Sequence, residues 1–174
     1  KQNMQKNIVA EPQLAGQGKQ KIEWVKRNMP ILRQIEDDFR KHQYFSGLRV
    51  LVCIHLEAKT AYLAQVFAAG GAEVAVTGSN PHSTKDDVVA ALAEEGMHVY
   101  ARYGATPEEM RQYMNRALDV RPNIMIDDGG DIAELVHTER QELLPEVLGA
   151  CEETTTGVLR AKARAKAGVL EFPV

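Results

Sequence analysis

Residues 49–55, RVLVCIH, indicate the fold class of this chain. It is a short, continuous run of β-branched and aliphatic residues, which is typical of a strand buried on both faces. Strands of that kind occur in parallel sheets that helices cover on both sides. The run therefore predicts a central strand of a layered α/β domain.

Similar runs recur four times downstream, and helical patterns separate them. The runs are AEVAVTG (72–78), MHVYAR (97–102), NIMIDD (123–128) and VLGACEE (147–153). The helical patterns cover residues 59–69, 84–95, 107–119 and 132–143, and a last helix is expected over 157–167. Strands that alternate with helices predict right-handed βαβ units. We predict an α/β fold with an open, doubly wound, mainly parallel sheet of the Rossmann-like type and helices on both faces.

Two short helices are expected before the sheet. Apolar residues recur at helical spacing from Ile22 to Phe39, and Pro30 interrupts them. Trp24 is expected to pack within this segment. Residues 1–18 are polar, so we expect a flexible arm there and one compact domain over 19–174.

The bulk composition bounds the function. The chain has 174 residues, 44% hydrophobic composition and a formal net charge of −3, which suits one domain with a real core and indicates neither a nucleic-acid nor a membrane partner. No apolar run is long enough to span a bilayer. The sequence shows no charged-then-apolar leader pattern, so we do not expect a secreted protein. Cys53 and Cys151 make no disulfide framework; both stand in apolar runs, so we expect buried, reduced thiols and a cytoplasmic protein.

The last seven residues, GVLEFPV (168–174), resemble the start of another strand. A domain rarely ends on an unshielded apolar edge. We therefore expect that the sequence is cut from a longer protein and that it exposes apolar surface near 169–174.

Dense polar groups follow the predicted strands. In an open parallel sheet, ligands bind outside the carboxyl ends of the strands, so these groups predict a small-molecule site. They are HLEAKT (55–60), Ser79 to Ser83, Arg102 with Tyr103, DDGGD (127–131) and EETTTG (152–157).

The segment DDGGD joins two carboxylates to a glycine turn that can approach a ligand closely. If the strand persists, only one carboxylate faces the site; we select Asp128 and expect Asp127 to point away. The alternative is an acidic turn in which Asp131 caps the next helix.

The segment EETTTG places Glu153 at the rim and three threonines, Thr154 to Thr156, at a helix N-terminus. Hydroxyls and free N–H groups there suit a polyhydroxylated or phosphorylated ligand. The alternative is N-capping by one threonine. His55 by itself would suggest a structural histidine, but with Asp128 and Glu153 at neighbouring strand ends it becomes a candidate proton shuttle between two carboxylates.

Other chemistries fit less well. His55 and Glu57 match half of a zinc deaminase signature whose PCxxC half is missing, and no cysteine pair has metal-ligand spacing, so no metal site is predicted. The chain has no P-loop, no GxGxxG and no GxSxG.

Four segments in unbroken order resemble the N-terminal half of adenosylhomocysteinase, the S-adenosylhomocysteine hydrolase family. They are residues 54–87 (IHLEAKT to STKDD), NIMIDDGGD (123–131), LVHTE (135–139) and EETTTGV (152–158). The resemblance covers residues 20–174, and it identifies residues 19–174 as the family's substrate-binding domain.

The resemblance implies a homotetrameric enzyme of one-carbon metabolism that reversibly cleaves S-adenosylhomocysteine to adenosine and homocysteine with a tightly held NAD. In this family the ribose 3′-hydroxyl is oxidised to a ketone, which acidifies the 4′ hydrogen; homocysteine is then expelled, water adds and the ketone is reduced again. His55, Asp128 and Glu153 match catalytic positions, and Asp128 and Glu153 also contact the substrate. Thr60, Asn80 and Ser83 match the substrate cleft, and Thr154, Thr155 and Thr156 match threonines that reach toward the cofactor.

The sequence departs from the commonest family pattern at Glu57 and Lys59, where many members have threonine and glutamate or glutamine. The HLEAKT version resembles a thermophilic and archaeal branch. In the common pattern these positions contact the substrate, including its base. The change therefore makes another purine a candidate, such as hypoxanthine in S-inosylhomocysteine. Lys85 also replaces a common glutamine, and we expect it to be an exposed residue at a helix start.

The family's catalytic lysine, its Asp–Asn partners, its NAD-binding domain and the tail that completes a neighbouring subunit's cofactor site have no counterpart in these 174 residues. We therefore expect this chain alone to be inactive. Two alternatives stay open: a stand-alone nucleoside-binding module without catalysis, and a regulatory paralogue that binds partners.

Overall fold

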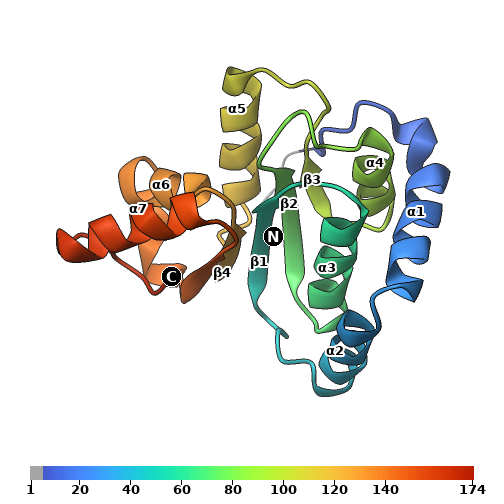
Figure 1. The fold of residues 1–174 in the computed structure, drawn as a ribbon, viewed down its shortest axis with the longest axis horizontal. Coiled ribbons are helices and arrows are strands. Elements are labelled where there is room, and N and C mark those ends of the chain that lie inside the picture. The colour runs from blue at the N-terminus through green and yellow to red at the C-terminus, as the bar shows by residue number, and fades with distance from the viewer. Residues whose placement is uncertain (1–5) are drawn as a thin grey trace.

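The computed structural model describes residues 6–174 and contains one five-stranded, all-parallel sheet (Figure 1). The strand order is β3-β2-β1-β4-β5. The strands are β1 (Arg49–Ile54), β2 (Glu73–Gly78), β3 (His98–Tyr100), β4 (Ile124–Asp127) and β5 (Gly149–Glu152). The predicted fold class is confirmed, and all five predicted strands are present.

Helices connect the strands in the predicted alternation. They are α1 (Ala15–Arg27), α2 (Pro30–His42), α3 (Ala58–Ala69), α4 (Asp86–Glu94), α5 (Pro107–Leu118), α6 (Asp131–Thr138) and α7 (Thr155–Lys166), with short 3-10 helices η1 (Pro12–Leu14) and η2 (Gln141–Glu146). The prediction of a single helix over 132–143 is wrong, because these residues form two elements, α6 and η2. Pro145 within η2 lacks the N–H that an α-helix would need.

Two apolar cores form, one on each face of the sheet. Alternate residues of β1 serve different faces, as the two-residue period of a strand requires. Val50 and Val52 belong to the core with α1, α3 and α4, whereas Leu51 and Cys53 belong to the core with α5 and α6. The strand order reverses between β1 and β4, so this pair marks the topological switch point at which α/β sheets bind ligands.

The N-terminal helices follow the predicted break at Pro30, which begins α2. Trp24 was expected to pack here, but that prediction is wrong, because its exposed fraction is 65%. Ile22 and Val25 lie on the buried face of α1, whereas Trp24 lies on its outer face.

The segment expected to be a flexible arm is only partly described, since residues 1–5 lie outside the described residues. Ile8 forms a parallel bridge with Tyr100, and α1 already begins at Ala15. The boundary expected at residue 18 therefore falls inside a helix. At Gly18 a Cβ atom would lie 1.9 Å from the Asp87 carbonyl oxygen, so this glycine lets α1 approach α4 closely.

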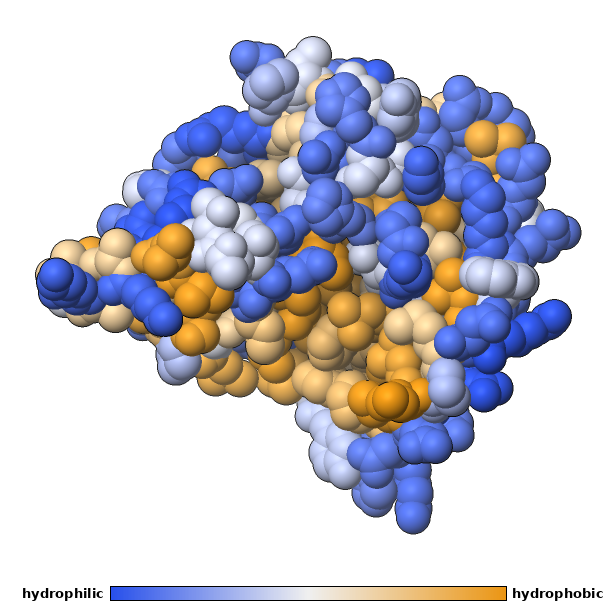
Figure 2. Space-filling model, in the orientation of Figure 1, coloured by the Kyte–Doolittle hydropathy of each residue, from blue (hydrophilic) through white to orange (hydrophobic). Residues whose placement is uncertain are grey.

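The C-terminal segment was expected to resemble a new strand, but it forms none within the described residues. Phe172 is buried against His137, with 4.7 Å between the ring centroids, and the Ala150 N–H donates to the Pro173 carbonyl at 2.9 Å. The segment thus lies along the edge strand β5. Val169 and Val174 remain about half exposed, as expected of this region. Figure 2 shows a band of apolar side chains across the lower face of the molecule, from the side of α7 toward α2.

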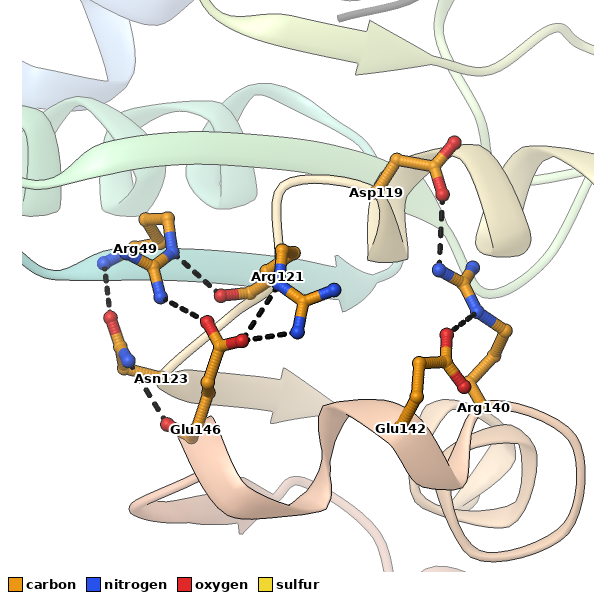
Figure 3. Close-up of polar contacts among 7 residues, drawn as sticks. All are labelled: Arg49, Asp119, Arg121, Asn123, Arg140, Glu142 and Glu146. Carbon is orange, nitrogen blue, oxygen red and sulfur yellow. Dashed lines mark hydrogen bonds and ion pairs between the residues drawn. The ribbon is translucent and has the colours of Figure 1, made fainter. Parts of the chain in front are cut away.

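An ion-pair cluster joins the amino ends of β1 and β4 to η2 (Figure 3). Glu146 accepts hydrogen bonds from Arg49 Nη2 at 2.7 Å and Arg121 Nε at 2.7 Å. Asn123 joins the same cluster through the Arg49 N–H and the Glu146 carbonyl. Arg121 has a φ of 57°, a left-handed conformation that is uncommon outside glycine, and its backbone carbonyl accepts a hydrogen bond from Arg49 Nε at 2.7 Å. This cluster lies at the end of the sheet opposite the polar loops.

Candidate active site at the switch point

Four side chains from three strand ends meet beside the switch point. His55 Nδ1 lies 2.7 Å from Ser83 Oγ, and His55 Nε2 lies 3.4 Å from Asp128 Oδ2. Ser79 Oγ donates to Asp128 Oδ2 at 2.8 Å. The side chain of His55 is 50% exposed and that of Asp128 is 13% exposed, so the imidazole is open to a ligand while the carboxylate is largely shielded.

The turn after β1 holds His55 in place. Thr60 Oγ1 donates to the His55 carbonyl at 2.5 Å. Glu57 Oε1 accepts the N–H groups of Lys59 and Thr60 and so caps α3. Thr60 is buried and Lys59 is exposed. In this structure Glu57 and Thr60 therefore stabilise the turn. The Lys59 side chain is exposed and has no polar partner in the described part of the chain.

The loop after β2 is folded by Asn80. Its side-chain oxygen accepts the His82 N–H at 2.8 Å, and its carbonyl accepts the hydroxyls of Ser83 and Thr84. Asn80 thus shapes the loop that brings Ser83 to His55. Lys85 is exposed at the N-cap position of α4, as predicted.

Asp127 and Asp128 separate as predicted. The Asp127 carboxylate is buried and accepts the N–H groups of Asp128, Ile132 and Ala133. Burial raises the pKa of Asp127 to about 6, although these three hydrogen bonds act to lower it. The alternative in which Asp131 caps α6 is wrong. The first-turn N–H groups of Ile132 and Ala133 bond to Asp127 instead, and Asp131 pairs with Arg160 at 2.9 Å.

The carboxylates of Asp128 and Glu153 were both expected beside His55. Within residues 6–174, His55 pairs with one carboxylate, that of Asp128. The Glu153 side chain is exposed, and its backbone N–H donates to the Asp127 carbonyl at 3.0 Å. The register that pairs Asp127 with Glu152 places Asp128 and Glu153 side by side at the ends of β4 and β5.

Thr154 to Thr156 begin α7. Thr154 occupies the N-cap position, but its side chain makes no capping hydrogen bond, so capping does not account for this threonine. Thr155 and Thr156 are exposed in the first turn. Their hydroxyls and N–H groups offer polar contacts to one edge of a dinucleotide, but the described residues include no glycine-rich cradle for its pyrophosphate.

Glu152 is a residue that the sequence did not single out. Its Oε1 accepts the N–H groups of Gly129 at 2.8 Å and of Thr154 at 3.1 Å. Its neighbour Glu153 was selected as a site residue, because the end of the strand was expected to face a ligand. The alternation along β5, which turns successive side chains in opposite directions, is the signal that could have separated the two glutamates.

A surface hollow of about 550 Å³ adjoins the cluster at Ser79. Apolar side chains of α5 and α6 line it, among them Met110, Met114 and Leu135, together with Asp131 and Arg160. Another hollow of about 580 Å³ lies at the amino ends of the strands, around Lys26, Glu36 and Arg40. The first hollow adjoins the cluster of His55 and Asp128 through Ser79, whereas the second lies at the opposite end of the strands.

Two further findings concern residues 6–174 alone. No three His, Cys, Asp or Glu side chains among them are grouped so that they could hold a metal ion. None of their helices combines the length and apolar character needed to cross a bilayer.

Known proteins resemble this chain along most of its length. Residues 6–144 match the family of S-adenosyl-L-homocysteine hydrolase. The chain is 54% identical over 166 residues to an adenosylhomocysteinase of Pyrococcus abyssi, which covers 95% of this chain and 39% of the relative. It is 52% identical over 158 residues to an S-inosyl-L-homocysteine hydrolase of Methanocaldococcus jannaschii, with 91% of this chain and 38% of the relative covered. An adenosylhomocysteinase of Thermococcus kodakarensis is 52% identical over 166 residues, 95% of this chain and 39% of its own length. The chain thus spans about two fifths of these relatives, and it belongs to the S-adenosyl-L-homocysteine hydrolase family.

Proposed function

We propose that this chain is the substrate-binding part of an NAD-dependent hydrolase that reversibly cleaves S-adenosylhomocysteine to adenosine and homocysteine. The observation that carries the proposal is the approach of His55 Nε2 to Asp128 Oδ2, 3.4 Å apart across the switch point. The names of the relatives and the position of the pair where α/β sheets bind ligands support it. In this proposal the protein is cytoplasmic and assembles as a homotetramer, as the family resemblance implies.

The proton positions around His55 follow from the hydroxyl of Ser83, which has one proton to donate. When Ser83 donates it to the Asn80 carbonyl, at 3.1 Å, His55 Nδ1 must carry a proton toward Ser83 Oγ. The contact between His55 Nε2 and the Asp128 carboxylate is then most favourable when Nε2 also carries a proton. We propose that His55 gives and takes this Nε2 proton beside the leaving sulfur and the attacking water, and that Asp128 keeps the ring oriented.

Glu153 and the threonines complete the proposed ligand contacts. The exposed Glu153 carboxylate would accept hydrogen bonds from the ribose hydroxyls, and Thr154, Thr155 and Thr156 would contact the cofactor. Bound NAD would supply reversible oxidation of the ribose 3′-hydroxyl, which acidifies the 4′ hydrogen. The residues of this chain bind, orient and transfer protons.

S-inosylhomocysteine is the alternative substrate, and Lys59 is the observation that favours it. Hypoxanthine presents an oxygen acceptor where adenine presents an amino donor, and a lysine ammonium can only donate. Lys59 is exposed in the first turn of α3, four residues after His55, and the relatives named S-inosyl-L-homocysteine hydrolase are 45–52% identical to this chain.

The test is a parallel assay of the two thioethers with the natural full-length protein and with its Lys59→Gln variant. The main proposal expects faster turnover of the adenosyl substrate, whereas the alternative expects faster turnover of the inosyl substrate and a shift toward adenosyl in Lys59→Gln. Absence of turnover of both substrates would contradict a hydrolase and favour a nucleoside-binding module or a regulatory paralogue. The 174-residue chain, assayed beside it, is expected to be inactive; measurable turnover by it would refute this part of the proposal.

A further inference from the structure

The carboxylate of Glu152 lies between the loop after β4 and the start of α7. Its Oε1 accepts the N–H of Gly129 at 2.8 Å and that of Thr154 at 3.1 Å. Gly129 directly follows Asp128, and Thr154 directly follows Glu153. One oxygen atom thus holds the residues next to both candidate site carboxylates.

The packing around this carboxylate leaves it little freedom. A Cβ atom at Gly157 would lie 2.1 Å from Glu152 Cδ and 2.2 Å from its Oε2, so only glycine fits under the carboxylate. A Cβ atom at Gly130 would in turn lie 3.5 Å from the Gly157 Cα, in ordinary contact. The glycine turn, Glu152 and the first turn of α7 therefore form one packed unit.

We propose that Glu152 is a positioning residue that sets the separation and direction of the Asp128 and Glu153 side chains. This inference rests on the proposed function. Glu152 does not itself contact the reacting atoms; it acts through the two backbone N–H groups that it fixes. An active site needs such support because small displacements of a catalytic group cost large factors in rate.

The hydrogen bonds of Glu152 make it possible to test its contacts and its charge separately. Both bonds end on Oε1, and an amide oxygen in Glu152→Gln can accept both of them. That variant removes the negative charge and keeps the two contacts. Glu152→Ala removes the charge and the contacts together, and Gly157→Ala displaces the carboxylate while leaving residue 152 unchanged.

The experiment measures kcat, KM and Tm of Glu152→Gln, Glu152→Ala and Gly157→Ala in the full-length protein, with whichever thioether the wild type hydrolyses. All rates are taken well below the Tm of each variant and divided by the folded fraction. We expect Glu152→Gln to remain close to wild type. We expect Glu152→Ala and Gly157→Ala to lose on the order of 100-fold in kcat/KM, as a displaced catalytic group does.

Two outcomes would overturn the inference. Wild-type kcat/KM in folded Glu152→Ala, with only a lower Tm, would show that the residue is structural. Equal losses in Glu152→Gln and Glu152→Ala would show that the charge acts, not the contacts. Asp128→Asn in the same series separates this failure from failure of the proposed function, because wild-type turnover in Asp128→Asn would remove the proposed site itself.

Discussion

Asp127 and Asp128 are adjacent in sequence, yet their carboxylates lie in opposite environments. Asp127 is 1% exposed and accepts three backbone N–H groups at the start of α6. Asp128 accepts the Ser79 hydroxyl and lies 3.4 Å from the His55 imidazole. The first carboxylate stabilises the loop and the second belongs to the proposed site, so substitutions at the two positions should differ in kind.

Asp128→Asn should abolish nearly all turnover of the full-length protein while the fold is kept. The amide can still receive the Ser79 hydroxyl, but it provides no charge to orient or stabilise the protonated imidazole. We expect a loss of at least roughly 1000-fold in kcat, as for carboxylates that orient a catalytic histidine. Steady-state kinetics and circular dichroism check the two halves of this prediction, and wild-type rates would remove Asp128 from the mechanism.

Ser83→Ala should produce a smaller defect of the same kind. The variant loses the 2.7 Å contact that fixes His55 Nδ1, while the Asp128 contact stays. We expect a fall of about tenfold in kcat, the equivalent of one hydrogen bond worth about 1.4 kcal/mol. Lys85→Ala, an exposed change close by on the same loop, is the matched control; an equal loss in both variants would contradict a role specific to Ser83.

Asp127 should make stability depend on pH with a defined sign. Its pKa is raised to about 6 in the fold, so the folded state binds the proton more tightly than the unfolded chain. The stability that this provides is fully present below pH ~4 and is lost as the pH rises through ~6. The free energy of unfolding of wild type minus that of Asp127→Asn should fall by up to about 3 kcal/mol between pH 4 and 7.

Urea denaturation of the two proteins at a series of pH values measures this difference. Other titrating groups largely cancel, since both proteins share them. A difference that stays flat, or that grows with pH, would show that the three N–H donors outweigh burial at Asp127.

The two cysteines should react at different rates with a thiol reagent. Cys53 is buried, and burial, reinforced by the nearby Asp127 carboxylate, raises the pKa of its thiol well above the ordinary value. Cys151 is exposed, contrary to the expectation of two buried thiols. Ellman's reagent should therefore label one thiol rapidly in the folded chain and two in denaturant, and Cys151→Ser should remove the rapid phase.

The ion-pair cluster at the amino ends of the strands should contribute to stability. Glu146 receives Arg49 and Arg121 together, and its side chain is 32% exposed. We expect Glu146→Ala to lower the free energy of unfolding more than Glu142→Ala does, because Glu146 receives hydrogen bonds from two arginines. Glu142→Ala removes a more exposed partner of Arg140, and we expect less than about 1 kcal/mol there. Equal effects in urea denaturation would contradict a special role for the cluster (Figure 3).

The amino-acid sequence was enough to predict the strands, most of the helices and the polar character of the strand ends. Apolar runs and helical periods are local, so β1 could be predicted from residues 49–55 and the break between α1 and α2 from Pro30. The alternation of a strand was also enough to select Asp128 over Asp127. The motifs around His55, Asp128 and Glu153 carried the family, which residues 6–144 confirm.

The hydrogen-bond partner of each polar group, by contrast, depends on the three-dimensional fold. Asp127, not Asp131, caps α6, and Glu152 joins two loops, because a carboxylate bonds to whichever N–H groups the fold brings within reach. The exposure of Trp24 and Cys151 likewise depends on which faces of α1 and β5 other elements cover. Local patterns fix periods along the chain, whereas hydrogen-bond partners and burial are set by neighbours that are distant in sequence.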